Sequence, residues 1–238
     1  MMGGPRPRRH FHDELDALQD TLLEMAGLVE ESVGQATRGV LARDRAISEV
    51  VRRKDDRVDE LEVEIDSRAM ELLALQQPMA KDLRQIMSTL KVSNDLERVG
   101  DHAVNIARAA ERLSEMPGLP DMPEIAEMAD IAGGMLADAL AAFVSRNSGT
   151  ARMVCLRDDK VDNLRRSLFR ILVTHMLEDP RRISPALELL LVSQNLERIA
   201  DLSTNIAEDV VFLVEGRTIK HRSEPLEAPD DAGFETPG

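Results

Sequence analysis

The sequence has almost no aromatic residues. Only 2 % of its 238 residues are aromatic, and Trp and Tyr are both absent. Sheet-rich folds depend on aromatic and β-branched residues, whereas this chain is rich in the helix formers Leu, Ala, Met, Glu and Arg. The composition therefore predicts an all-α fold. With 43 % hydrophobic residues, the chain can bury one large core or two smaller ones.

The sequence also predicts neither an internal disulfide nor a membrane span. The single cysteine, Cys155, cannot form an internal disulfide, and we expect it to be a small buried hydrophobe in a reducing compartment. No run approaches the roughly 20 apolar residues of a transmembrane helix. The N-terminal MMGGPRPRRHFH is basic but lacks the apolar core of a signal peptide. We therefore expect a cytoplasmic protein that reaches a membrane only peripherally, through its partners.

Basic residues are fewer than acidic ones. The chain has 30 basic and 44 acidic residues, which gives a formal net charge of −14. A chain this acidic is repelled by the phosphate backbone of nucleic acid. Cations and protein partners suit it better.

Apolar residues recur at steps of three and four, which is the spacing of amphipathic helices. Prolines and glycines separate the periodic segments, most clearly in SEMPGLPDMPE at 114–124. The predicted helices cover about 11–40, 43–75, 79–112, 125–144, 151–177 and 184–214. The predicted division is a basic flexible leader (1–10), a first three-helix bundle (11–114), a proline-rich linker (115–124), a second three-helix bundle (125–216) and an acidic disordered tail (217–238).

The second half of the chain repeats the first. VSNDLERVGDHAVNIA begins at Val92 and VSQNLERIADLSTNIA begins at Val192, with nine of sixteen positions identical. KDDRVDEL at Lys54 is matched by RDDKVDNL at Arg157. The turns between the helices are short, so neighbouring helices must run antiparallel. We predict two tandem duplicated three-helix bundles of long antiparallel helices.

Each repeat carries four carboxylates on two neighbouring helices. Acidic residues four positions apart lie one turn apart on one helix face, here at the border of the apolar arc. The eight candidate metal ligands are Asp55, Asp59, Glu97 and Asp101 in the first repeat and Asp158, Asp162, Glu197 and Asp201 in the second. Clusters of oxygen donors suit Mg²⁺, Ca²⁺, Mn²⁺ or iron, and zinc less well because His and Cys are missing.

Other interpretations of these carboxylates stay open. They can form an ordinary solvated face, or pair with Arg98 and Arg198, in which case the chain is a ligand-free helical scaffold. They can also serve a carboxylate-bridged di-metal enzyme, an oxidase or a phosphohydrolase. Ferritin-like di-iron bundles use Glu-x-x-His, but His102 has no Glu three residues before it and its counterpart is Leu202. No phosphate-binding loop or nucleophile motif is present, so we predict that the protein is not an enzyme.

Two further groups of residues, four methionines and three N-terminal arginines, have expected roles outside the metal site. Met70, Met79, Met87 and Met135 occur at helical spacing, and we expect them to fill the core. Arg6, Arg8 and Arg9 form a basic cluster. It is either a mobile arm or a contact with anionic lipid.

The chain resembles the PhoU family from about residue 11 to residue 222, most specifically in LERVGDHAVNIA, DDKVDNL, QQPMAKDLRQIM, HMLEDPRRI and NLERIADLSTNIAE. The resemblance implies a phosphate-transport regulator that links the phosphate-specific ABC transporter to a sensor histidine kinase and represses the starvation response when phosphate is plentiful. It also implies multinuclear metal clusters of Fe, Zn, Mg or Mn on the eight carboxylates, and a homodimer. Ala200 departs from the family pattern, which often has the glycine that Gly100 supplies in the first repeat.

Overall fold

The structure, a computed structural model, describes residues 7–76 and 78–219, and within these ranges it contains no strand. The helices are α1 (Pro7–Ala42), α2 (Ile47–Gln76), α3 (Ala80–Ser114), α4 (Pro123–Ser145), α5 (Ser148–Cys155), α6 (Asp158–Glu178), a 3-10 turn η1 (Pro180–Arg182) and α7 (Ile183–Glu215). α1 begins inside the segment 1–10 that the sequence predicts as a flexible leader. Most of the predicted tail, 220–238, lies outside the described residues, as do residues 1–6 and 77.

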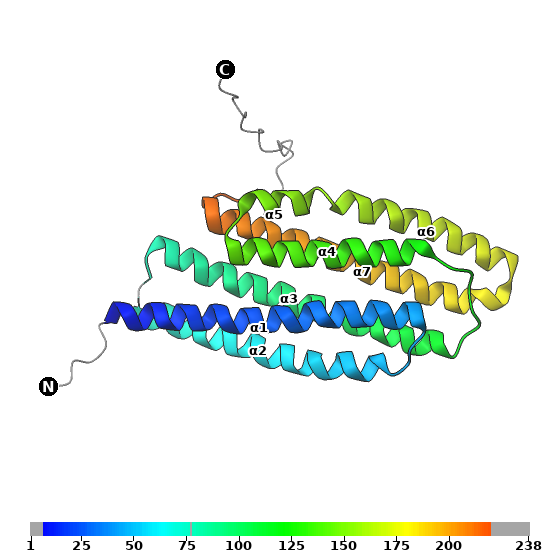
Figure 1. The fold of residues 1–238 in the computed structure, drawn as a ribbon, viewed down its shortest axis with the longest axis horizontal. Coiled ribbons are helices and arrows are strands. Elements are labelled where there is room, and N and C mark those ends of the chain that lie inside the picture. Colours follow the sequence, from blue (N-terminus) through cyan, green and yellow to red (C-terminus); the bar gives the residue numbers. More distant parts are fainter. Residues whose placement is uncertain (1–6, 77, 220–238) are drawn as a thin grey trace, which may run out of the picture.

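Two bundles lie side by side along a common long axis (Figure 1). α1, α2 and α3 form the first bundle, and α4 to α7 form the second. α3 and α7, which carry the two copies of the repeated motif, pack against each other at the centre. This arrangement confirms the predicted all-α fold of two duplicated bundles.

The apolar stripes of the long helices form the core. On α1, buried Leu18, Leu22 and Met25 follow one another at steps of three and four. The methionine prediction is correct for Met135, which is fully buried, and wrong for the other three, since Met79 for example is 73 % exposed. Met70, on α2, Met79, at the start of α3, and Met87, on α3, are all exposed.

The predicted fifth helix, 151–177, is divided into two. α5 ends at Cys155 and α6 begins at Asp158. Asp158 and Asp159 occupy the first turn of α6, where carboxylates complement the helix dipole. Arg157, at the break, forms an ion pair with Asp138 of α4. The first repeat has no such break, because α2 continues through the equivalent residues.

Ion pairs join the two bundles along α3 and α7. Lys91 Nζ lies 3.1 Å from Asp209 Oδ1, and the Arg112 guanidinium donates to Glu188 Oε2 at 2.7 Å. The Asp209 side chain is almost completely buried. Truncating a partner of a buried carboxylate is costly, so these contacts hold the bundles in a fixed relation.

The helix α4 is long and apolar enough to cross a membrane by length and composition, and it is the one such helix among the residues described. Half of its most apolar window is buried inside the molecule. α4 packs against α7, α5, α6 and α1. Its apolar composition is accounted for by its place in the core.

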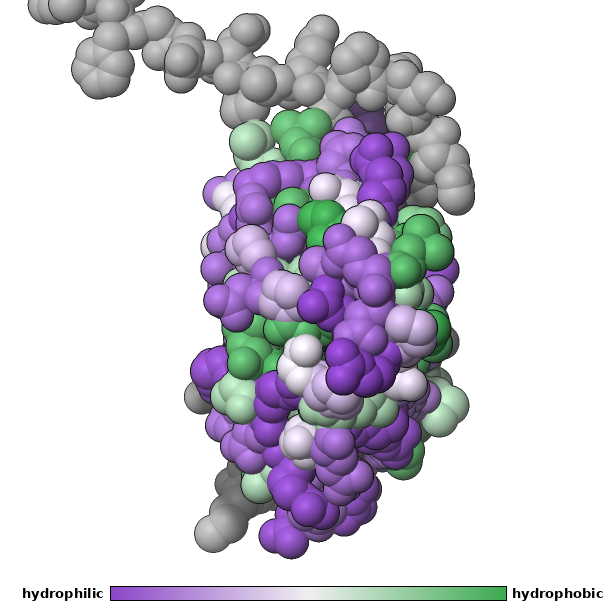
Figure 2. Space-filling view, turned by 90° about the vertical axis from the view of Figure 1, so that its right-hand side faces the viewer, coloured by the Kyte–Doolittle hydropathy of each residue, from purple (hydrophilic) through white to green (hydrophobic). Residues whose placement is uncertain are grey.

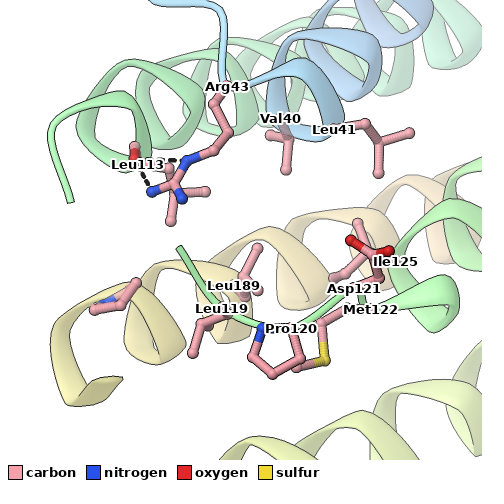
Figure 3. Close-up of a pocket in the computed structure, with 11 residues that line it drawn as sticks. Val40, Leu41, Arg43, Leu113, Leu119, Pro120, Asp121, Met122, Ile125 and Leu189 are labelled. Carbon is pink, nitrogen blue, oxygen red and sulfur yellow. Dashed lines mark hydrogen bonds between the residues drawn. The ribbon is translucent and has the colours of Figure 1, made fainter. Parts of the chain in front are cut away.

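The first helix of each repeat ends in the same way. Arg43 and Arg146, 103 positions apart, both adopt a left-handed backbone with φ of 53° and 51°. The Arg43 side chain donates to the carbonyl of Leu113 at 2.9 Å (Figure 3). It also donates to the carbonyl of Met116 at 2.8 Å, and both bonds satisfy acceptors at the end of α3. Beside it, a mainly apolar pocket of about 160 Å³ lies under the 119–122 linker and contains none of the predicted metal ligands.

Gly39→Ala is expected to destabilise the fold by about 1–3 kcal/mol, the usual range for overpacking. A Cβ at Gly39 would lie 3.0 Å from Ile47 Cβ and closer still to its Cγ2, so α2 could not keep its approach to α1. Gly27→Ala is the matched control on the same helix, because a Cβ there meets nothing within 4 Å. It should gain up to about 1 kcal/mol from helix propensity. Urea denaturation measures both, and equal effects would contradict the packing argument.

Candidate metal centre

The four carboxylates of the first repeat lie together between α2 and α3. Asp55 and Glu97 are partly buried, and Asp59 and Asp101 are exposed. Burial, followed by the negative charges of Asp59 and Asp101, raises the pKa of Asp55 to about 6, although Arg108 offsets part of this. Burial and the charge of Asp101 also raise the pKa of Asp59 and of Glu97. Asp55, Asp59, Glu97 and Asp101, hereafter the first cluster, therefore interact electrostatically.

Glu62 is a fifth carboxylate beside the first cluster, and the sequence interpretation missed it. Burial and the charges of Asp66 and Asp59 raise the pKa of Glu62, and its own charge contributes to the raised pKa of Glu97. A signal was available in the repeat, since Glu62 lies three residues after Asp59 on the same face. Its counterpart 103 positions later is a cation, Arg165.

Gly100 allows Asp55 to approach the backbone of α3. A Cβ at this position would lie 2.9 Å from Asp55 Oδ1, closer than real Cβ contacts. Ala200 occupies the equivalent position in the second repeat and is fully buried. The methyl group of Ala200 fills the space that a carboxylate oxygen uses in the first repeat.

The four carboxylates of the second repeat, hereafter the second cluster, are all partly buried between α6 and α7. Burial, then the charges of Asp201 and Asp162, raise the pKa of Asp158 to about 6. Arginines compensate the other half of this cluster. Arg165 Nε lies 3.4 Å from Glu197 Oε1, and Arg198 Nη1 lies 2.9 Å from Asp201 Oδ2. The arginine pairing that the sequence left open thus occurs here.

No cation compensates the first cluster in the same way. Arg98, the counterpart of Arg198, pairs with Asp95 at 3.4 Å instead. Among the residues described, none of the four carboxylates of the first cluster forms an ion pair. The two clusters therefore share their acidic residues but differ in local charge.

A cavity of about 290 Å³ adjoins the second cluster. It is lined by Arg98 from α3, Asp158 from α6, and Arg198, Asp201, Leu202, Thr204 and Asn205 from α7. The hydroxyl of Thr204 is buried and has no hydrogen-bond partner within the part of the chain that the structure describes. The second cluster is thus accessible from the space between the two bundles.

The donor chemistry of the first cluster fits a hard cation. In the residues that the structure covers, no three His, Cys, Asp or Glu side chains are already arranged as metal ligands. Mutual repulsion separates carboxylates that lack a counter-charge, and a bound cation removes that repulsion. Uncompensated oxygen donors open to solvent are the ligands that Mg²⁺, Mn²⁺ and iron prefer. The second cluster fits less well, because arginines already pair with two of its four carboxylates.

The histidine beside the first cluster and the single cysteine both make contacts outside the cluster. His102 adjoins Asp101, but its Nδ1 lies 2.9 Å from Asn195 Oδ1 on α7. Burial raises the pKa of the Cys155 thiol to about 11, and the thiol donates to the Ala151 carbonyl at 3.5 Å. Both side chains therefore have packing roles.

Comparisons with known proteins agree with the duplication. A family model described as "PhoU domain" matches residues 22–110 and again residues 125–210. The chain is 37 % identical to the phosphate-specific transport system accessory protein PhoU homolog of Clostridium acetobutylicum, covering 89 % of this chain and 97 % of that protein. The Aquifex aeolicus protein of the same name is 40 % identical, covering 88 % of this chain and 95 % of its own length.

Solved structures show the same fold. The crystal structure of PhoU from Pseudomonas aeruginosa superposes with a TM-score of 0.85 at 38 % identity, covering 87 % of this chain and all of that one. The phosphate transport system regulatory protein PhoU from Streptococcus pneumoniae gives a TM-score of 0.80 at 29 % identity, covering 88 % and 99 %. Sequence and structure thus point to the same set of relatives.

Proposed function

The chain belongs to the PhoU family, and on that premise we propose that it is a cytoplasmic accessory regulator of phosphate uptake. One observation carries the proposal: relatives aligned over 88–89 % of this chain are named phosphate-specific transport system accessory proteins. These names describe an accessory role and no enzyme. They therefore speak against the alternative of a di-metal oxidase or phosphohydrolase.

The finer part of the proposal is the adaptor role. The protein links the phosphate-specific ABC transporter to a sensor histidine kinase and restrains the starvation response when phosphate is plentiful, acting as a homodimer. An acidic chain with two rigidly joined bundles supports this role, because it offers separate surfaces to two partners. The S. pneumoniae relative is named as regulatory, which agrees with it.

Metal binding is the other finer part. We assign the metal to Asp55, Asp59, Glu97 and Asp101, with Glu62 beside them, and secondarily to Asp158, Asp162, Glu197 and Asp201. The bound ion, Fe, Zn, Mg or Mn, supplies positive charge and does no chemistry on a substrate. This chain's carboxylates hold it, and through it α2 is fixed to α3.

Deleting the gene tests the adaptor role. Cells without the protein are expected to express a phosphate-starvation reporter in phosphate-rich medium, and a plasmid copy of the gene should restore repression. A plasmid copy with Glu97→Ala separates the parts of the proposal: restored repression would show a regulator that needs no metal in the first cluster. Normal repression in the deletion strain, together with no transporter or kinase captured by the tagged protein, would favour the ligand-free scaffold.

A further inference from the structure

The hairpin formed by α6 and α7 exposes several large apolar side chains, as the α2–α3 hairpin also does. Leu177, at its tip, is 82 % exposed, and four others are 41–53 % exposed. The set, hereafter the hairpin patch, is Phe169, Leu177, Ile183, Leu187 and Leu191. The tip of the hairpin lies at the end of the molecule seen in Figure 2, where hydrophobic side chains are exposed among hydrophilic ones.

The register of the two helices brings the exposed apolar side chains of α6 and α7 to similar heights. Arg165 of α6 lies 3.4 Å from Glu197 of α7, and the helices run antiparallel. Each turn further along α6 is therefore level with one turn back along α7. Phe169 is thus within one turn of Leu191 along the helix axes, and Leu177 is within one turn of Leu187.

Two arginines on the exposed face of α6 accompany the apolar side chains. Arg166 and Arg170 lie within one turn of Phe169, and each donates from Nε to the backbone carbonyl four residues earlier, at 3.2 and 3.3 Å. Neither forms an ion pair with an acidic side chain of the described chain. Residues 165–182 hold five arginines and two acidic residues, in a chain whose net charge is −14. Arg165, Arg181 and Arg182 pair with Glu197, Asp179 and Glu178, so Arg166 and Arg170 supply the positive charge that is not paired within the described residues. The hairpin patch is thus a local basic surface on an acidic protein.

The duplicated fold does not require this basic surface. The positions of the first repeat that correspond to Arg166, Phe169 and Arg170 are Val63, Asp66 and Ser67. The first repeat therefore has the same helices without the two arginines. The difference indicates that the second repeat uses its hairpin for an additional contact.

We propose that the hairpin patch docks on an anionic lipid bilayer. Exposed apolar side chains among basic ones are the pattern of surfaces that bind the membrane interface. Arg166 and Arg170 contact lipid phosphates, while Phe169 and Leu177 enter the boundary between headgroups and acyl chains. Leu177 projects from the end of the hairpin, and lipid covers such a side chain without the matching pocket that a protein partner has to provide.

The overall negative charge does not prevent this docking. Charges in physiological salt are screened over about 8 Å. When the exposed face of α6 lies along the bilayer, the first bundle is separated from the lipid by α4 and α7, which pack between α6 and α1–α3, and a helix is about 10 Å in diameter. The arginines of the hairpin then dominate the local interaction.

Vesicle flotation of the full-length protein tests the proposal, with phosphatidylglycerol–phosphatidylcholine vesicles compared with pure phosphatidylcholine. The protein should float with the anionic vesicles only, and high salt should release it. Arg166→Gln with Arg170→Gln should weaken binding about 30-fold, and Leu177→Ser about tenfold. Arg38→Gln with Arg53→Gln is the charge-matched control, and Leu75→Ser the apolar control at the other hairpin. Circular dichroism verifies that each variant is folded.

Each outcome decides the proposal. Loss of binding in the hairpin variants with retention in both controls supports it. Absence of wild-type binding to anionic vesicles, or equal losses in the controls, overturns it. Loss only when Arg6, Arg8 and Arg9 are replaced by Gln also overturns it, because the N-terminal cluster would then be the contact. Capture of an acidic protein without vesicle binding assigns the hairpin patch to a protein partner and likewise overturns it.

Discussion

Glu97→Ala is expected to abolish metal binding at the first cluster and to leave the second cluster unchanged. Glu97 is partly buried between α2 and α3, and its pKa is raised by burial and by the charges of Asp101 and Glu62. A carboxylate in that position loses its unfavourable interactions when it is protonated or when a cation joins it, and at neutral pH the cation is the more effective of the two. Elemental analysis of protein purified without chelators should therefore show the metal content of the first bundle lost.

The matched variant is Glu197→Ala in the second repeat. Arg165 already lies 3.4 Å from Glu197, so this carboxylate is less available to a metal than Glu97. We expect a smaller loss of metal from Glu197→Ala than from Glu97→Ala. The comparison uses identical substitutions at repeat-equivalent positions of one chain.

Exchanging Glu62 and Arg165 isolates the effect of local charge. Glu62→Arg gives the first cluster the cation of the second, and should weaken its metal affinity about 10–100-fold, as outer residues of metal sites commonly do. Arg165→Glu is the reverse exchange and should strengthen metal binding at the second cluster.

Unchanged metal content in Glu97→Ala and in Asp59→Ala would rule out the first cluster as a metal site.

The two repeats have diverged around a shared backbone. The first keeps uncompensated carboxylates and Gly100, which gives Asp55 room against α3. The second has Ala200 and two arginine pairs, and its hairpin exposes Phe169 and Leu177. Duplication supplied two copies of one scaffold, and the differences lie in charge and exposure. We infer that the first repeat is the one suited to a cation and the second the one suited to a surface contact.

The spacing of apolar residues was sufficient to predict the helices, because each helical turn has to place an apolar side chain in the core. Leu18, Leu22 and Met25 had to share a face, and they are buried together. Helix geometry likewise placed Glu97 and Asp101 on one face, and the repeat indicated which helix would stand opposite. The interaction of Asp55 with Asp101 in the structure agrees with that prediction.

Features that depend on neighbours could not be predicted in this way. At the break between α5 and α6, Arg157 pairs with Asp138 on another helix, a contact that the local spacing of residues does not reveal. Met79 has core-like chemistry, but it lies beside the α2–α3 turn where no third helix covers it. Glu62 joins the first cluster through Glu97 of α3; its spacing from Asp59 was a signal, but the arginine at the equivalent position of the second repeat excluded it from the repeated pattern.

Asp55→Asn combined with Asp158→Asn is expected to stabilise the metal-free protein at neutral pH. In the folded state the pKa of each carboxyl is raised from its ordinary 3.8 to about 6. Folding is therefore favoured by protonation: the stability that each group contributes is fully present below pH 3.8 and is lost as the pH rises through about 6. The shift corresponds to at most about 3 kcal/mol per group at pH 7.5, and solvent screening of these partly buried groups reduces this to about 1–2 kcal/mol.

Thermal unfolding in the presence of a chelator measures the effect. At pH 7.5 the double variant should unfold about 4–16 °C higher than the wild type, at roughly 2–4 °C per kcal/mol. The difference should shrink as the pH falls through 6 and disappear near pH 3.8. Asp56→Asn is the control, because Asp56 is exposed and pairs with Arg52 at 3.2 Å. Adding metal should reverse the order, since only the wild type keeps the ligands whose binding stabilises the fold. A double variant less stable than the wild type at pH 7.5 in chelator would contradict the view that these carboxylates are held at an energetic cost until a cation binds.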